Sequence, residues 1–307
     1  MTELRQRWIL DPAATDDVAA MYVEQRIPDR VTASHPVVLL HGGGGQGTDW
    51  GTTPDGRPGW ADLLVDRGWP VHVVDRPGHG RSPGRLPAPA AIPMTARVFA
   101  PGDRPDHSQW PGTGGVDDPA VRLLAASASG LPVDLAVAQV IEQRLLEALL
   151  DEVGPAVIVA HSLGACAAWL VAEARPDLVA AVVALEPAGP PFLDVPGTPL
   201  RLPEGITAAP LGSGARLTGL PTVPVSVVEG ETSRMAEACG PVVEHLREAG
   251  VDVEHIVLVE HGLRGNGHGL PIERNNRDVL EVILNWITTL AVVAPTPARH
   301  SRTGEQP

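Results

Sequence analysis

The sequence predicts the α/β class, with a mostly parallel central sheet that is covered by helices on both faces. Short apolar segments alternate along the chain with longer segments in which apolar residues recur every three or four positions. The first pattern is typical of strands buried on both faces, and the second is typical of amphipathic helices. No internal repeat is present. This alternation therefore predicts one doubly covered sheet.

The composition fits a soluble globular protein. The chain has 307 residues, of which 43% are hydrophobic and 20% are charged, and its net charge is −14. This acidity argues against nucleic acid or an anionic membrane as a partner. The two cysteines, Cys166 and Cys239, form no disulfide framework or metal-ligand pattern, and we expect no metal or organic cofactor. Residues 1–10 lack an apolar run of signal-peptide length and no segment reaches transmembrane length, so we expect a cytoplasmic protein.

The N-terminal part combines strands with a glycine-rich loop. The predicted elements are strands at 18–27 (paired with 8–10), 36–40 and 70–75, and a helix at 59–68. The glycine run that starts after His41 and extends to Gly47 follows the second strand directly, and such a run directs backbone N–H groups at a ligand. It lacks the GxxxxGK[ST] pattern of a phosphate loop. We therefore favour an oxyanion loop over a flexible linker.

The strand at 70–75 ends in a turn-rich stretch that extends to Ser82. Asp75 and His79 are candidates for a catalytic triad. Both precede the candidate nucleophile in the chain, and we favour a structural role for them, in which this turn braces the oxyanion loop.

Two irregular stretches interrupt the pattern of strands and helices. Residues 83–132 are rich in Pro and Gly, and a stretch of this length is usually a lid, a binding loop or disordered. Its large apolar residues favour an ordered cover over a pocket; they are Met94, Phe99, Trp110, Leu123 and Leu124. Residues 187–221 form a second cap candidate. We expect a single domain at 1–293 with these two insertions, and a disordered tail at 294–307.

The C-terminal part continues the alternation. The predicted strands are at 179–185, 223–228 and 251–259. The predicted helices are at 133–153 and 271–293, and a third is capped by Thr232 or Ser233 and ends at Ala249. In the helix at 133–153 the residues expected to face inward are Leu135, Val137, Ile141, Leu145, Leu149 and Leu150. Those expected to face outward are Glu142, Arg144, Glu147 and Asp151.

Ser162 lies where the apolar run from Val157 meets an Ala-rich helical segment. The small residues Ala160 and Gly164 flank it at two positions on either side, where bulky side chains would clash in a sharp turn. This is the pattern of a nucleophile elbow, with Ala in place of the first Gly. The N-terminus of the following helix favours a developing negative charge. A serine that only caps this helix is the alternative.

A serine nucleophile needs a base and an acid, which follow it in that fold in the order Ser, acid, His. We favour His268 as the base over His261, because glycines around His268 allow its loop to fold over the site. Glu186 ends the strand after Ser162, whereas Glu229 and Glu231 end the next strand. These residues alone leave the choice of acid open.

Several blocks of the sequence carry a resemblance to a known family. They are 41–50, 52–60, 78–82, His161-Ser162, Glu186-Pro187, 265–268 and 274–276, and they extend over most of the chain from about residue 36 to 286. In these blocks the chain resembles the α/β-hydrolase fold, and more narrowly the bacterial carboxylesterases typified by esterase 713. The resemblance implies that Glu186 is the acid and that the backbone N–H groups of Gly43 and Leu163 form the oxyanion hole. It also suggests a homodimer.

Two departures from that family stand out. Its members carry adjacent cysteines where this chain has Gly43-Gly44, which predicts a more flexible loop here. They are also exported, whereas no signal peptide is evident at the start of this chain.

These observations predict a serine hydrolase that acts on a small-molecule carboxylic ester through Ser162, His268 and Glu186. We expect Gly44, Trp50, Trp110 and Phe192 to line its substrate pocket. A lactonase, amidase or acyltransferase with the same triad is the main alternative. A non-catalytic binding protein with the same fold is the other.

Overall fold

The computed structural model describes residues 2–13, 19–84, 86–88, 90–189 and 216–290. They form one eight-stranded sheet with the order β1-β2-β4-β3-β5-β6-β7-β8. The strands are β1 (Glu3–Leu10), β2 (Ala20–Ile27), β3 (Val37–Leu40), β4 (Val71–Asp75), β5 (Ala156–His161), β6 (Val179–Leu185), β7 (Val225–Glu229) and β8 (Val253–Val257). The pairs β1–β2 and β2–β4 are antiparallel, and the other neighbouring strands are parallel. The mostly parallel sheet that the sequence predicts is thus confirmed.

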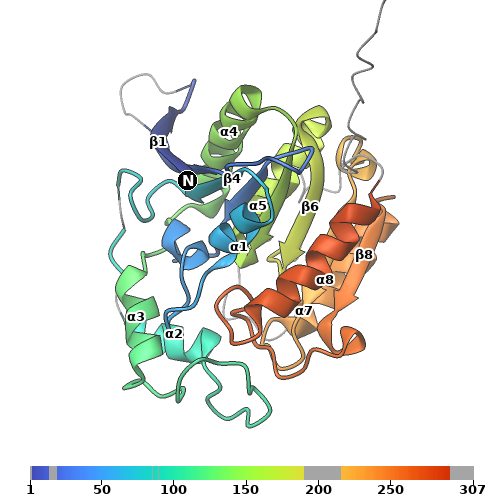
Figure 1. Cartoon of the computed structure of the whole chain (residues 1–307). Coiled ribbons are helices and arrows are strands. Elements are labelled where there is room, and N and C mark those ends of the chain that lie inside the picture. Colours follow the sequence, from blue (N-terminus) through green and yellow to red (C-terminus); the bar gives the residue numbers. More distant parts are fainter. Residues whose placement is uncertain (1, 14–18, 85, 89, 190–215, 291–307) are drawn as a thin grey trace, which may run out of the picture.

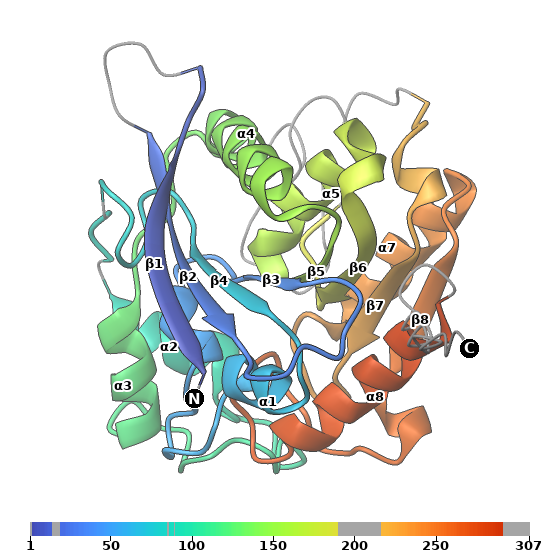
Figure 2. The same cartoon turned by 45° about the horizontal axis from the view of Figure 1, so that its top comes forward.

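Helices cover both faces of this sheet. They are α1 (Trp60–Asp66), α4 (Leu135–Val153), α5 (Ala165–Ala174), α7 (Ala236–Glu248) and α8 (Asn276–Thr289). One core contains α1 and α8, and the other contains α4, α5 and α7 (Figures 1 and 2). Within β5, Val157 and Val159 join the first core, while Ile158 and Ala160 join the second. The strand is apolar from Ala156 to Ala160 because it is buried on both faces.

The first cap segment, residues 83–132, contains two short helices that the periodicity of the sequence did not predict. α2 (Ala91–Phe99) and α3 (Pro119–Ser127) pack on each other at one end of the molecule (Figure 1). The carboxylate of Asp118 accepts a hydrogen bond from the N–H of Ala120 at the start of α3, and Pro119 is its first residue. An N-cap residue followed by proline is a signal for a helix start, so the sequence did contain the information for α3.

In helix α4 the predicted burial of two residues is wrong. Glu142, expected on the outer face, is 2% exposed, whereas Val137, expected inside, is 56% exposed. The buried residues of α4 are Gln139, Glu142, Leu145, Leu146, Leu149 and Leu150. They follow a helical period, but two of them are polar. A hydrophobicity pattern cannot identify such positions, because the partner that makes burial of Glu142 favourable lies in another element.

The C-terminal elements differ from prediction mainly at their ends. Helix α7 begins after Met235 rather than directly after Thr232 or Ser233. The hydroxyl oxygen of Ser233 accepts a hydrogen bond from the N–H of Met235, while its O–H is donated to the carboxylate of Glu186. Strand β8 ends at Val257, and a short 3-10 turn follows it. The predicted tail at 294–307 and most of the second cap candidate lie outside the described residues. Within the described part of the chain, no helix combines the length and apolarity needed to cross a membrane.

Candidate active site

Ser162 occupies the sharp turn between β5 and α5. Its φ of +51° lies in the left-handed region, which is uncommon for residues other than glycine. A 3-10 turn, Ser162–Gly164, joins the strand to the helix. A methyl group at Gly164 would come within 2.5 Å of the carbonyl oxygen of His41. Glycine is needed at position 164 because the backbone that follows β3 passes directly beside it.

Glu186 leaves the sheet next to Ser162. The strand register pairs His161 of β5 with Leu185 of β6, so the next residue of each strand emerges at the same edge. Glu186 also has a positive φ, of +42°. Left-handed backbone at two neighbouring strand ends is a costly arrangement that is typical of functional sites.

The carboxylate of Glu186 is fully buried and accepts three hydrogen bonds. The donors are the N–H of Gly230 at 2.8 Å, the hydroxyl of Ser233, and Nδ1 of His268 at 2.6 Å. Burial raises the pKa of Glu186, while the bonds from Ser233 and Gly230 oppose that rise because they stabilise the charged form. The structure thus brings together two of the three residues that the sequence predicts for a triad.

The imidazole of His268 is suited to accept a proton. Burial lowers the pKa of His268 to about 4, so the ring is neutral at pH 7. Because Nδ1 donates its hydrogen to Glu186, Nε2 is the basic nitrogen. His268 and Ser162 line the same cavity.

The competing acids and the competing base have other partners. Glu231 accepts hydrogen bonds from Arg264 and from the N–H of Gly265, each at 2.8 Å. Glu229 contacts Nε2 of His255 at 2.9 Å. His261 is exposed at the end of a 3-10 turn. Of the three carboxylates considered, Glu186 is therefore the one that contacts His268.

The glycine-rich loop predicted to be the oxyanion loop (residues 41–47, called the oxyanion loop below) packs directly against the turn that carries Ser162. An added methyl group at Gly42 would lie 3.2 Å from Cβ of Ser162, and one at Gly43 would lie 2.4 Å from Cδ1 of Leu163. Gly43 and Leu163, the two residues implied as oxyanion donors, are thus in close contact. Both line the cavity.

Charged residues at the end of β4 and directly after it hold the oxyanion loop from behind. The guanidinium of Arg76 donates to the carbonyl oxygens of His41 at 3.3 Å and Gly42 at 3.2 Å. The same guanidinium donates to both carboxylate oxygens of Glu142, at 2.9 and 3.1 Å, and this ion pair is buried. Asp75 accepts a hydrogen bond from the N–H of Gly47 at 2.5 Å. These contacts agree with the structural role expected for Asp75. They also show that Arg76 and Glu142 help to hold this loop, which the sequence analysis did not predict.

A cavity of about 440 Å³ opens above Ser162. Its wall on the side of the cap segment is mostly apolar, although Thr95, Ser127 and Ser129 also line it. The apolar residues there include Ala91, Met94, Val98, Phe99, Leu124 and Leu131. Gly44 and Trp50 also line the cavity, as the sequence predicts. Asp49 contributes a carboxyl group to the lining, and burial raises its pKa to about 7.

Trp110, another residue predicted to line the pocket, is not part of the lining formed by the described residues. Trp110 is 1% exposed and packs within the cap, where its indole N–H donates to Asp118 at 2.8 Å. The prediction that Trp110 lines the pocket is therefore wrong, because its indole is buried inside the cap. Phe192 lies outside the described residues.

Two of the sequence blocks that carry the family resemblance, 52–60 and 274–276, contact each other. Arg57 donates to the carbonyl oxygen of Arg274 and to Oδ1 of Asn276, each at 2.9 Å. The indole N–H of Trp60 donates to the carbonyl oxygen of Asn276 at 2.9 Å. These bonds attach the segment that follows His268 to α1. Among the described residues, no group of three or more His, Cys, Asp or Glu side chains is arranged to hold a metal ion.

Comparison with known proteins gives consistent likenesses over most of the chain. A family model described as alpha/beta hydrolase fold matches residues 35–225. The chain is 35% identical over 311 residues to "Probable secreted lipase phiG" of Fungal sp. (strain ATCC 74256), covering 87% of this chain and 85% of that protein. The name of that protein includes secretion, whereas the cytoplasmic location of this chain stays a prediction from its sequence.

Solved structures share the same arrangement. The chain is similar to a structure described as a novel bacterial esterase, with a TM-score of 0.68, 24% identity and 94% of each chain covered. It is also similar to naproxen esterase (carboxylesterase NP) from Bacillus subtilis, with a TM-score of 0.51, 14% identity, and 93% of this chain and 92% of that one covered.

Proposed function

This chain belongs to the alpha/beta hydrolase fold family, and from that premise we propose that it is a serine hydrolase of carboxylic esters. The observation that carries the proposal is the 2.6 Å contact between Nδ1 of His268 and Glu186, at a cavity that both His268 and Ser162 line. The name of the fungal lipase, and the names of the esterases that are similar to this chain in fold, support an ester as the substrate.

In the first half of the reaction, Nε2 of His268 removes the hydroxyl proton of Ser162 as Oγ attacks the ester carbonyl. The N–H groups of Gly43 and Leu163 hold the resulting oxyanion. The carbonyl reforms, the bond to the alcohol oxygen breaks, and the imidazolium of His268 protonates that oxygen. The carboxylate of Glu186 keeps Nδ1 protonated throughout and stabilises the imidazolium.

In the second half, water replaces the alcohol. His268 takes a proton from the water molecule as its oxygen attacks the acyl-enzyme carbonyl, and the same oxyanion hole holds the second intermediate. Collapse releases the carboxylic acid and returns the proton to Oγ of Ser162. No other reactant is needed.

The cavity favours neutral esters with an apolar group. Its cap-side wall is mostly apolar, and no Arg occurs in the lining formed by the described residues. A carboxylate or phosphate on the substrate would therefore lose hydration without gaining a cation. Gly44 and Trp50 are proposed to contact the substrate.

The central test is the Ser162→Ala variant. Hydrolysis of p-nitrophenyl butyrate should fall on the order of 10⁴-fold or more, because no other group can form the acyl-enzyme. Labelling by a fluorophosphonate probe should be lost as well. Ser226→Ala is a matched control, since Ser226 lies buried in β7 away from the cavity and should be labelled like the wild type. Undiminished turnover by folded Ser162→Ala would refute the proposed function.

A further inference from the structure

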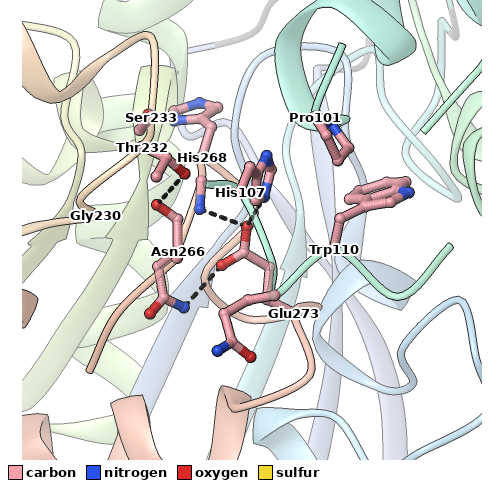
Figure 3. Close-up of polar contacts among 12 residues, drawn as sticks. Pro101, His107, Trp110, Gly230, Thr232, Ser233, Asn266, His268 and Glu273 are labelled. Carbon is pink, nitrogen blue, oxygen red and sulfur yellow. Dashed lines mark hydrogen bonds and ion pairs between the residues drawn. The ribbon is translucent and has the colours of Figure 1, made fainter. Parts of the chain in front are cut away.

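A second buried carboxylate, Glu273, lies behind His268 in the histidine loop (residues 262–275). Glu273 is 0% exposed. It accepts hydrogen bonds from the N–H of Gly267 at 2.7 Å and from Nδ2 of Asn266 at 2.8 Å. Nε2 of His107 lies 2.7 Å from it, and because a carboxylate has no proton to donate, His107 is the donor (Figure 3).

These bonds fix the backbone immediately before His268. Gly267 is its direct neighbour, and Asn266 is also tied by its own carbonyl oxygen, which accepts from the N–H of Thr232 at 2.8 Å. On the other side, the carbonyl oxygen of His268 accepts a hydrogen bond from Nε2 of His161 at 2.8 Å. Glu186 orients the ring of His268, and the bonds to Glu273 fix the position of the backbone that carries this ring.

His107 links this loop to the cap segment, because it lies between α2 and α3. An added methyl group at Gly267 would come within 2.2 Å of Cε1 of His107, so the ring packs directly on the loop backbone. The N–H of Gln109 donates to the carbonyl oxygen of Gly265 at 3.1 Å. The N–H of Arg274 donates to the carbonyl oxygen of Gln109 at 2.8 Å. The cap segment thus runs along the histidine loop and is hydrogen-bonded to it.

We propose that Glu273 is a positioning residue, which sets the distance between His268 and Ser162. Because Glu273 is bonded to His107, the position of His268 then also depends on the contact between the cap segment and the histidine loop. The inference rests on the proposed function. Neither Glu273 nor His107 lines the cavity formed by the described residues. Their loss should therefore reduce proton transfer while leaving the substrate contacts in place, because a misplaced base affects kcat more than ground-state binding.

The decisive experiment compares Glu273→Gln with Glu231→Gln on p-nitrophenyl butyrate. Both residues accept a backbone N–H of the same loop, but Glu231 holds Gly265, further from His268, and is partly exposed. Glu273→Gln should lower kcat about 10- to 100-fold and leave KM within about threefold. Glu231→Gln should change neither value by more than about threefold. Rates are normalised to active sites titrated with the fluorophosphonate, so that unfolded protein does not contribute.

A pair of variants at His107 tests the same link and is available if Glu273→Gln does not fold. His107→Gln presents an amide nitrogen near the place of Nε2 and should keep most of kcat. His107→Phe keeps a ring on Gly267 but cannot donate to Glu273, and it should lose kcat like Glu273→Gln. Equal kcat in both His107 variants, or a folded Glu273→Gln variant with kcat within threefold of wild type, would overturn the inference. Neither result would affect the proposed function, which depends on Ser162→Ala.

Discussion

The oxyanion loop and the histidine loop both reach Ser162, but they are held by different parts of the molecule. Buried charges of the central domain hold the oxyanion loop at its start, through Arg76 and its partner Glu142 on α4. The cap adds one backbone bond, from the N–H of Ser129 to the carbonyl oxygen of Gly44. The histidine loop is held by its own carboxylate, Glu273, and by Glu231 and Thr232 after β7. Unlike the oxyanion loop, it also contacts a buried cap side chain, His107.

This difference separates two parts of the proposed chemistry. The oxyanion donors depend on packing between strands and α4, which is part of the main core. The general base depends on how the cap lies against the loop. Changes where the cap contacts the histidine loop should therefore alter proton transfer first, whereas changes behind β4 should alter stability and the oxyanion hole. The following variants test that division, in order of expected effect.

The largest effect is expected at the acid that orients His268. Glu186→Gln removes the charge that stabilises the imidazolium, and kcat for p-nitrophenyl butyrate should fall by about 10⁴-fold. Glu231→Gln is the matched control because its carboxylate contacts Arg264 and Gly265 instead. If Glu231→Gln reduced kcat more than Glu186→Gln, the proposal would have assigned the acid to the wrong strand.

The next effect is on stability, behind the oxyanion loop. Glu142→Gln leaves the guanidinium of Arg76 buried without a counter-charge, which should lower the free energy of unfolding by about 3–5 kcal/mol. Glu152 lies on the same helix and forms an ion pair with Arg7 of β1 that is open to solvent, so Glu152→Gln should cost less than about 1 kcal/mol. Urea unfolding of both variants measures the difference, and equal losses would contradict the special role of the buried pair.

A pH-dependent effect is expected at Asp49, beside the oxyanion loop. Burial raises the pKa of Asp49 to about 7, from its usual value of 3.8. The folded chain therefore binds this proton more tightly than the unfolded chain, and the stabilisation is lost as pH rises towards and above 7. Relative to wild type, Asp49→Asn should gain about 2 kcal/mol in unfolding free energy between pH 5 and pH 8. A difference that does not change with pH would show that Asp49 ionises normally.

The smallest effect is expected inside the cap. Trp110→Phe removes the indole N–H that Asp118 accepts and should lower the free energy of unfolding by about 1–2 kcal/mol. Because Trp110 does not line the cavity, KM for p-nitrophenyl butyrate should stay within about twofold of wild type. A marked change in preference between acetate and butyrate esters would instead indicate that Trp110 reaches the substrate.

Much of the fold was predictable because its signals are local. The apolar strands, the helices between them and the small residue at 164 are visible in short windows of sequence. The helices of the cap were missed because they are short and lie in a segment rich in proline and glycine, although Asp118 and Pro119 marked the start of one of them. The placement of Trp110 in the cap rather than in the cavity lining had no local signal.

The sequence by itself determined the sheet, the turn at Ser162 and a small set of candidate acids and bases, because backbone propensity and burial on both faces act over a few residues. Only the tertiary structure decided which acid contacts His268, that Glu142 is buried against Arg76, and that His107 contacts Glu273. Those partners are 82, 66 and 166 positions apart. Whether such a polar group is buried depends on a partner that folding brings to it, and no local pattern specifies that partner.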